Sequence, residues 1–353
     1  MRLRLVWLAA VAGALLALSV ATGATAAPPG NSFVVHPLVS DNGVPGTTTD
    51  TNLVNAWGLD AGPLTPWWVA DNGTNVATLY TGAGAVLPPV FQVGDAPTGL
   101  VFNGTTGFNI MDGNTGHALF LFDSEAGVIS AWNGSLGSTA EPEVTVPGAV
   151  FKGLAIAETT AGPRLYATDF HNGQVDVFDG SWQPVNMPFQ FFDPTIPSDY
   201  APFGIQAIGS QIFVTYAKTQ AGSDDEAHGQ GLGFVDAFDA ATGLLDARVA
   251  THGQLNAPWG LAMAPGTFGR FGGDLLVGNF GDGEITAYQP IPGGLYAPRG
   301  QLRTPDDGRV AIDGLWSLQF GRGGPSGSAD TLFFTAGPND ESDGLFGSIT
   351  PGS

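Results

Sequence analysis

Short apolar runs separated by polar, glycine-containing turns recur along almost the whole chain, and the same unit repeats six times. Each unit opens with a triplet whose third residue is Leu or Ile and whose second residue is Gly in five of the six copies. The triplets are Trp57-Gly58-Leu59, Thr98-Gly99-Leu100, Lys152-Gly153-Leu154, Phe203-Gly204-Ile205, Trp259-Gly260-Leu261 and Trp316-Ser317-Leu318. Runs this short, bounded by turn residues, predict β-strands.

Two further apolar runs follow each triplet, and a less regular one completes most units. The second runs are residues 67–70, 118–122, 164–168, 211–216, 274–278 and 331–335, and the third runs are 76–80, 128–132, 175–178, 234–238, 285–288 and 345–349. Four strands joined by turns form a meander, and meanders bury both apolar faces when they pack around an axis. The sequence therefore predicts an all-β, six-bladed β-propeller of four-stranded antiparallel blades.

The ends of the repeat region predict how the ring closes. The last unit has three runs before the chain ends at Ser353, whereas residues 33–39 form an extended apolar run before the first unit. We expect this N-terminal strand to pair into the last blade and protect its edge. First strands crowd together at the axis, so we expect the recurrent Gly to be required by the close approach of neighbouring backbones.

Residues 1–27 have the features of a secretory signal peptide. Arg2 and Arg4 precede an apolar run over residues 5–18, and the small residues Ala24-Thr25-Ala26 follow. Such a run is too short for a membrane span. The prediction is a removed signal peptide, a single propeller domain over residues 28–353 and a secreted, extracellular location.

The composition narrows the class of partner. The chain has 11 Lys and Arg against 32 Asp and Glu, a formal net charge of −21, and no Cys. Binding to nucleic acid or to anionic lipid needs clustered basic residues. We therefore expect no nucleic acid and no membrane insertion, but an extracellular small molecule, glycan or peptide. The acidity favours solubility outside the cell, and cation binding is the alternative.

The strand directions of a meander place the starts of first strands and the turns between second and third strands on one rim of the propeller. Two long segments, residues 218–231 and 186–202, are expected to reach this rim, and long loops in compact domains are usually functional or disordered. The acidic and His residues of the first segment, including His228, belong either to a solvated loop or to one with a cation-binding or lid role. The candidate ligand-binding residues are Asn55, Trp57, Asn72, Lys152, Trp259 and Trp316.

Polar residues on the same rim are candidates for metal binding and catalysis. Asp71, Asp169 and Asn279 could hold calcium or magnesium, with His171 as general base or Lys152 as an electrostatic clamp. The alternative is a structural role. Asp or Asn recurs at this position in four blades, with Asp123 as the fourth residue, and such side chains often bond the backbone of their own turn. The tryptophans likewise are either wedges between blades or stacking platforms for a ligand.

The sequence resembles a family of exported bacterial propellers of unknown function that is related to NHL and YVTN-type repeats. The resemblance is carried by residues 53–59, 70–74, 169–173, 256–262, 277–283 and 335–339. It implies a six-bladed ring and export, and it supplies no catalytic residues. Ala56 departs from the Pro that the family usually has, which concerns only the local turn.

Two hypotheses about function remain open at this point. The first is a non-enzymatic secreted module whose top face binds a carbohydrate, peptide or envelope component. The second is a metal-dependent lactonase, hydrolase or lyase acting at the same channel mouth. Convergence of Asp71, Asp169, His171 and Asn279 at the axis would favour the enzyme.

Overall fold

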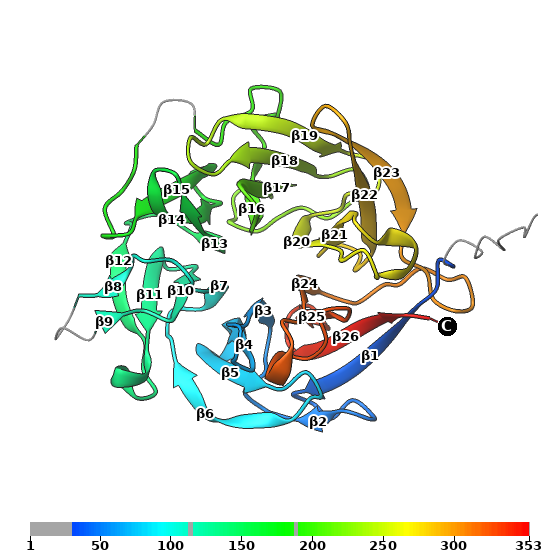
Figure 1. The fold of residues 1–353 in the computed structure, drawn as a ribbon, viewed down its shortest axis with the longest axis horizontal. Coiled ribbons are helices and arrows are strands. Elements are labelled where there is room, and N and C mark those ends of the chain that lie inside the picture. Colours follow the sequence, from blue (N-terminus) through cyan, green and yellow to red (C-terminus); the bar gives the residue numbers. More distant parts are fainter. Residues whose placement is uncertain (1–29, 112–115, 187–189, 353) are drawn as a thin grey trace, which may run out of the picture.

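Six antiparallel sheets surround one central axis in the computed structural model, which describes residues 30–111, 116–186 and 190–352 (Figure 1). The first strands β3, β7, β13, β16, β20 and β24 lie innermost, and each blade extends outward from its first strand. The predicted all-β, six-bladed propeller is therefore confirmed. The predicted signal peptide lies outside the described residues.

The blades follow one another in chain order. Blade one contains β3 (Ala56–Asp60), β4 (Trp67–Asp71), β5 (Val76–Tyr80) and β6 (Val86–Gln92). Blade two contains β7 (Pro97–Phe102), β10 (Phe120–Ser124), β11 (Val128–Trp132) and β12 (Glu141–Thr145). Blade three contains β13 (Phe151–Thr159), β14 (Gly162–Asp169) and β15 (Gln174–Asp179). Blade four contains β16 (Tyr200–Ile208), β17 (Gln211–Lys218), β18 (Phe234–Asp239) and β19 (Leu245–Thr251). Blade five contains β20 (Pro258–Met263), β21 (Leu275–Asn279), β22 (Ile285–Ile291) and β23 (Leu295–Gln301). Blade six contains β24 (Leu315–Phe320), β25 (Leu332–Ala336), β26 (Leu345–Pro351) and β1 (Phe33–Ser40).

Blade three has a less regular outer edge than the other blades. Beyond β15, Val185 donates its amide to the Val177 carbonyl, and an isolated bridge joins Phe178 to Pro184. Helical structure in the described ranges is limited to short 3-10 turns, and none of these helices has the length and apolar character needed to cross a membrane.

Glycine at the axis is explained by close approach between neighbouring first strands. A Cβ on Gly204 would lie 2.1 Å from the Trp259 carbonyl oxygen, and one on Gly99 would lie 2.2 Å from the Leu154 amide nitrogen. No side chain fits at such distances without moving the backbone. The steric reason predicted for the repeated Gly is confirmed at these positions.

Threonine hydroxyls join adjacent blades near the axis. Thr168 donates to the Phe203 carbonyl at 2.7 Å, and Thr98 donates to the Phe151 carbonyl at 2.9 Å. Each bond runs from one blade to the first strand of the next, so these buried polar groups are satisfied across an interface.

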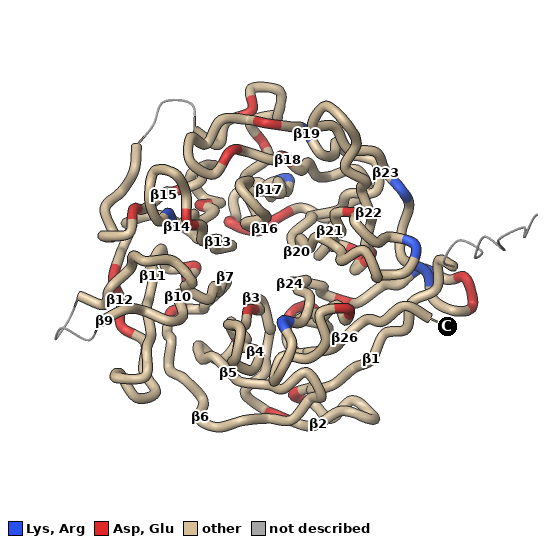
Figure 2. The backbone as a smooth tube through the Cα atoms, viewed as in Figure 1, with Lys and Arg blue, Asp and Glu red and all other residues tan. Residues whose placement is uncertain are grey.

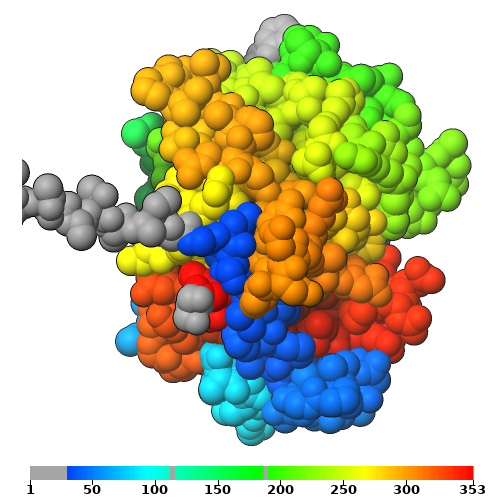
Figure 3. Space-filling view, turned by 90° about the vertical axis from the view of Figure 1, so that its right-hand side faces the viewer, coloured from blue at the N-terminus to red at the C-terminus, as the bar shows by residue number. Residues whose placement is uncertain are grey.

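The N-terminal strand closes the ring, as the sequence predicted. β1 pairs antiparallel with β26 as the outer strand of blade six, and β2 (Thr48–Thr49) adds parallel to β1. Figure 3 shows this N-terminal segment in blue beside the C-terminal strand in red and the segment after blade five in orange. The first and last parts of the chain thus belong to one sheet.

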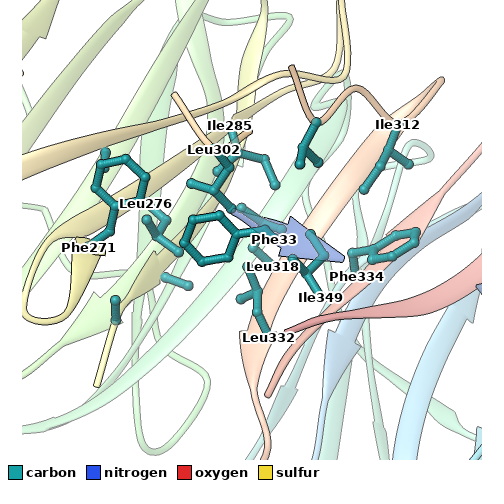
Figure 4. Close-up of a cluster of buried hydrophobic side chains, with 14 of the residues drawn as sticks. Phe33, Phe271, Leu276, Ile285, Leu302, Ile312, Leu318, Leu332, Phe334 and Ile349 are labelled. Atoms are coloured by element: carbon teal, nitrogen blue, oxygen red, sulfur yellow. The ribbon is translucent and has the colours of Figure 1, made fainter. Parts of the chain in front are cut away.

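The core lies between the blades. In the interface of blades five and six, Phe33 packs against Phe268 and Phe271, with ring centroids 5.0 and 5.8 Å apart, and against Leu302 and Ile349 (Figure 4). Because the closing strand contributes Phe33 to this cluster, it joins two blades by hydrophobic contact as well as by hydrogen bonds.

Candidate binding site on the top face

One rim of the propeller, here called the top face, carries the starts of the first strands together with the turns that follow the second strands. Backbone hydrogen bonds join these segments, from the Asn72 amide to the Asn55 carbonyl and from the Phe280 amide to the Ala257 carbonyl. The prediction that both kinds of segment share a rim is confirmed.

An aromatic plug fills the axis beneath the top face. Trp57 stacks on Trp316 with ring centroids 3.6 Å apart, Phe280 stacks on the same indole at 3.9 Å, and Trp259 meets it edge-on at 5.8 Å. The three tryptophans are at most 8% exposed. The hypothesis that they are stacking platforms for a ligand is therefore corrected, because their faces are covered by one another and they act as wedges between blades.

Lys152 lies above this plug in a charged pair. Its Nζ is 2.5 Å from Glu125 Oε1 and 5.3 Å from the centroid of the Trp57 ring, and the residue is only 2% exposed. Asn72 donates to the second oxygen of the Glu125 carboxylate at 3.2 Å. The ammonium group is thus paired and covered rather than free to act as a clamp on a substrate.

Asn55 extends the same set of contacts toward blade six. It donates to Asn72 Oδ1 at 3.2 Å and to Glu341 Oε2 at 2.6 Å, and its own Oδ1 accepts a hydrogen bond from the Trp316 indole. Asn55 has φ of 48°, a left-handed conformation that Asn tolerates better than most residues. We call Asn55, Asn72, Glu125, Lys152 and Glu341 the mouth network.

The mouth network has an acidic character. Burial raises the pKa of Glu341, repulsion from Glu226 and Glu125 adds to the rise, and Lys152 opposes it. The hydrogen bond that His228 Nε2 donates to Glu226 Oε1 raises the pKa of His228. These mutual effects place carboxylates from blades two, four and six around a single mouth, an arrangement that disfavours anionic ligands.

The three predicted metal ligands do not form a metal centre. Asp169 accepts hydrogen bonds from the Asn172 side chain and amide, and Asn279 donates to Asp282 and to the Gln254 carbonyl, so each holds its own turn. In the described part of the chain no group of three or more His, Asp or Glu side chains is placed to hold a metal. The structural alternative describes Asp169 and Asn279, whereas the Asp71 side chain is fully buried.

His171 lies instead at a cleft between blades three and four. The cleft has a volume of about 490 Å³ and is formed by the turn after β14, the loop after β17 and the segment that precedes β16. His171 Nδ1 is 2.6 Å from Asp224 Oδ1, both side chains are about half exposed, and this hydrogen bond raises the pKa of His171. The remaining lining includes Phe170, Asn172, Ser198, Tyr200, Thr219, Gln220, Ala221 and Ser223.

Sequence reasoning located the top face but missed its carboxylates. Glu125, Glu226 and Glu341 all lie in turns that were assigned to this rim, yet none was named as a site residue on its own. The only available signal was that Lys152 replaces an apolar residue or Thr in its triplet and so needs an acidic partner.

Two viral proteins align with most of the chain. Uncharacterized protein R648 of Acanthamoeba polyphaga mimivirus is 32% identical over 336 residues, which cover 90% of this chain and 80% of R648. Uncharacterized protein L690 of the same virus is 30% identical over 336 residues, with 90% and 86% covered. This chain belongs to their family. Because both relatives are viral, they do not support the bacterial, exported origin expected from the sequence resemblance.

Solved structures resemble the chain in fold. Virginiamycin B lyase from Staphylococcus aureus has a TM-score of 0.48 and 12% identity, covering 90% of this chain and 99% of the lyase. A gluconolactonase from Xanthomonas campestris has a TM-score of 0.41 and 15% identity, covering 65% and 81%. No protein-family model matches the chain. At these identities the likeness carries no information on activity.

Proposed function

We propose that this propeller is a secreted, non-enzymatic module that binds a carbohydrate in the cleft between blades three and four. The observation that carries the proposal is the chemistry of the cleft wall, where hydroxyl and amide groups predominate and neither Lys nor Arg is present. Neutral sugars need such alternating donors and acceptors. Tyr200, which is partly exposed, adds an aromatic side chain of the kind that packs against sugar rings.

The charge of the surroundings supports a neutral ligand over an anionic one. The chain carries a formal net charge of −21, and Asp224 stands in the cleft wall itself. A ligand bearing phosphate or several carboxylates would meet repulsion on approach. A metal-dependent hydrolase is disfavoured as the second hypothesis, because Asp169 and Asn279 hold their own turns and Asp71 is fully buried.

Binding is tested with the purified chain on an array of neutral and acidic glycans and extracellular peptides. Ala221→Trp is designed to fill the cleft from an exposed loop position, and we expect it to abolish binding of a neutral glycan without changing the melting temperature. Leu64→Trp, at a site that is 86% exposed, is the matched control. Selective retention of a peptide would show that the ligand is a peptide and not a carbohydrate. Binding that is unchanged in Ala221→Trp would show that the binding site lies outside this cleft.

Export is tested separately from binding. The N-terminus of protein recovered from the culture medium, read by mass spectrometry, is expected near residue 28. Recovery of the chain only inside cells, with its first residues intact, would contradict the proposal of secretion.

A further inference from the structure

Two carboxylates lie buried between blades six and one. Asp71, the last residue of β4, has an exposed fraction of 0%, and Asp50, in the segment joining β2 to β3, is 8% exposed. Burial raises the pKa of Asp71 well above its usual range, and repulsion from Asp50 adds to the rise, so the two groups lie close enough to interact. Within the described chain, the groups that act on Asp71 include no Lys, Arg or His.

Three buried oxygen atoms at this place lack a hydrogen-bond partner. Both carboxylate oxygens of Asp71 and the hydroxyl oxygen of Thr78 are inaccessible and unpaired within the described residues. Thr78 is 1% exposed and lies on the same face of the sheet as Asp71, because Asp71 pairs with Val76 and Val69 pairs with Thr78. The hydroxyl and amide of Thr78 are near enough to lower the pKa of Asp71, although no hydrogen bond of normal geometry joins the two side chains. Buried acceptors normally have partners, so unpaired oxygens that converge indicate a missing positive group.

The hydrogen-bond donors that surround the two carboxylates are neutral. Asp50 Oδ1 accepts hydrogen bonds from the Asn52 amide at 3.0 Å and from the Asn52 side chain at 2.8 Å, and Asp50 Oδ2 accepts one from the Tyr80 hydroxyl at 3.1 Å. The Tyr80 ring belongs to the apolar cluster between blades six and one, with Trp67 and Phe346. In such an environment two neighbouring carboxylates need a cation or a proton between them.

We propose that Asp71, Asp50 and Thr78 bind a divalent cation of the calcium type between blades six and one. Carboxylate and hydroxyl oxygens are ligands of hard cations, and calcium accepts irregular oxygen sets more readily than magnesium does. The cation joins the segment that follows the closing strand to the second strand of blade one. It therefore stabilises the ring at its seam.

The equivalent residue of blade three shows why the site is confined to this interface. Asp169 pairs with Phe151 in the register in which Asp71 pairs with Ala56. The oxygens of Asp169 accept hydrogen bonds from Asn172 and from the Val150 amide, so that carboxylate is satisfied by its own turn. Asp169→Asn is consequently a matched control for Asp71→Asn.

The test uses the chelator-treated full chain and two readouts. Thermal unfolding is followed as calcium chloride is added, and terbium luminescence is excited through the Trp and Tyr side chains, of which Trp67 and Tyr80 border the site. We expect calcium to raise the melting temperature of the wild type and of Asp169→Asn, and terbium to give calcium-displaceable emission in both. Asp71→Asn should lose both responses, and Thr78→Val, which keeps both charges, should bind more weakly.

Several results would overturn the assignment. An equal rise in melting temperature with sodium chloride at matched ionic strength would show only screening of the acidic surface. Asp71 would be shown to be a buried neutral acid if calcium did not change the melting temperature of the wild type and if Asp71→Asn had a higher melting temperature than the wild type. If Asp71→Asn does not fold, an unchanged calcium affinity in Thr78→Val would likewise show that calcium does not bind at this place.

Discussion

Asp123 is a buried acid on the axis side of blade two. Its Oδ1 accepts hydrogen bonds from the Gly99 amide at 2.5 Å and from the Thr98 hydroxyl at 2.9 Å, whereas its Oδ2 has no partner within the described residues. Burial outweighs these hydrogen bonds and raises the pKa of Asp123 to about 7. The folded chain therefore retains a proton here that the unfolded chain releases near the ordinary Asp pKa of 3.8.

This proton makes stability depend on pH. Because the unfolded state binds fewer protons between about pH 4 and pH 7, the free energy of unfolding falls as the pH rises through that window, by up to about 1.4 kcal/mol per pH unit from this group. Asp123→Asn keeps an acceptor for Gly99 and should flatten the slope. Urea unfolding at several pH values measures it, with the exposed Asp246→Asn as control for net charge. A slope unchanged in Asp123→Asn would contradict the expected protonation.

Similar residues in the repeat differ in role because their register differs. Asp71, Asp123 and Asp169 all follow an apolar second run and were interpreted together, but only Asp71 and Asp169 lie opposite the residue that precedes their triplet. In blade two Ser124 takes that place, opposite Pro97, and Asp123 lies at the register shift before it. Since successive side chains of a strand point to opposite faces, this offset gives Asp123 a different direction from Asp71 and Asp169, and its Oδ1 reaches the Gly99 amide. The sequence could predict polar residues at these strand ends, but their direction depends on pairing that only the fold defines.

The closing strand serves both of its neighbouring blades through an irregularity in its pairing. The register of β1 with β26 shifts between Pro37 and Val39. Phe33 on one side of the shift enters the cluster between blades five and six, whereas Val39 on the other side enters the cluster between blades six and one. A bulge of this kind reverses the face to which later side chains point.

Phe33 is the residue through which this element can be tested. Phe33→Ala removes a ring that is fully buried between Phe268 and Phe271, and large-to-small changes of this type lower the free energy of unfolding by about 3–5 kcal/mol. His36→Ala, at an exposed position of the same strand, should have a much smaller effect. Chemical unfolding of both variants measures the difference. Equal stability of the two variants would mean that β1 closes the ring through backbone pairing alone.

The elements were largely predictable from the sequence, and their irregularities were not. Apolar runs and turns identified the strands, and the missing run of the last unit identified residues 33–39 as the closing strand. The bulge in β1 and the irregular edge beyond β15 depend on contacts with neighbouring blades. Such contacts leave no periodic signal in the chain.

At the scale of the whole molecule, the 32 acidic residues of the chain outnumber its 11 basic residues. Figure 2 shows Asp and Glu around the ring and toward the axis, with few Lys and Arg among them. Several of the basic residues are already paired, as in Lys152 with Glu125 and Arg248 with Asp236. The excess negative charge is therefore not neutralised within the chain.

This excess predicts an unusual response to salt. Repulsion among 32 acidic residues opposes the compact state, and raising the ionic strength from 0.01 M to 0.1 M shortens the screening length from about 30 Å to about 10 Å. In the presence of a chelator, sodium chloride should therefore raise the melting temperature at pH 7. Near pH 4, close to the sequence pI of about 4.1, the same addition should have little effect because the net charge is small. Calorimetry at both pH values measures the difference. A melting temperature that falls with salt at pH 7 would mean that the paired charges contribute more than the repulsion, and that the acidity of the surface does not limit the stability of the ring.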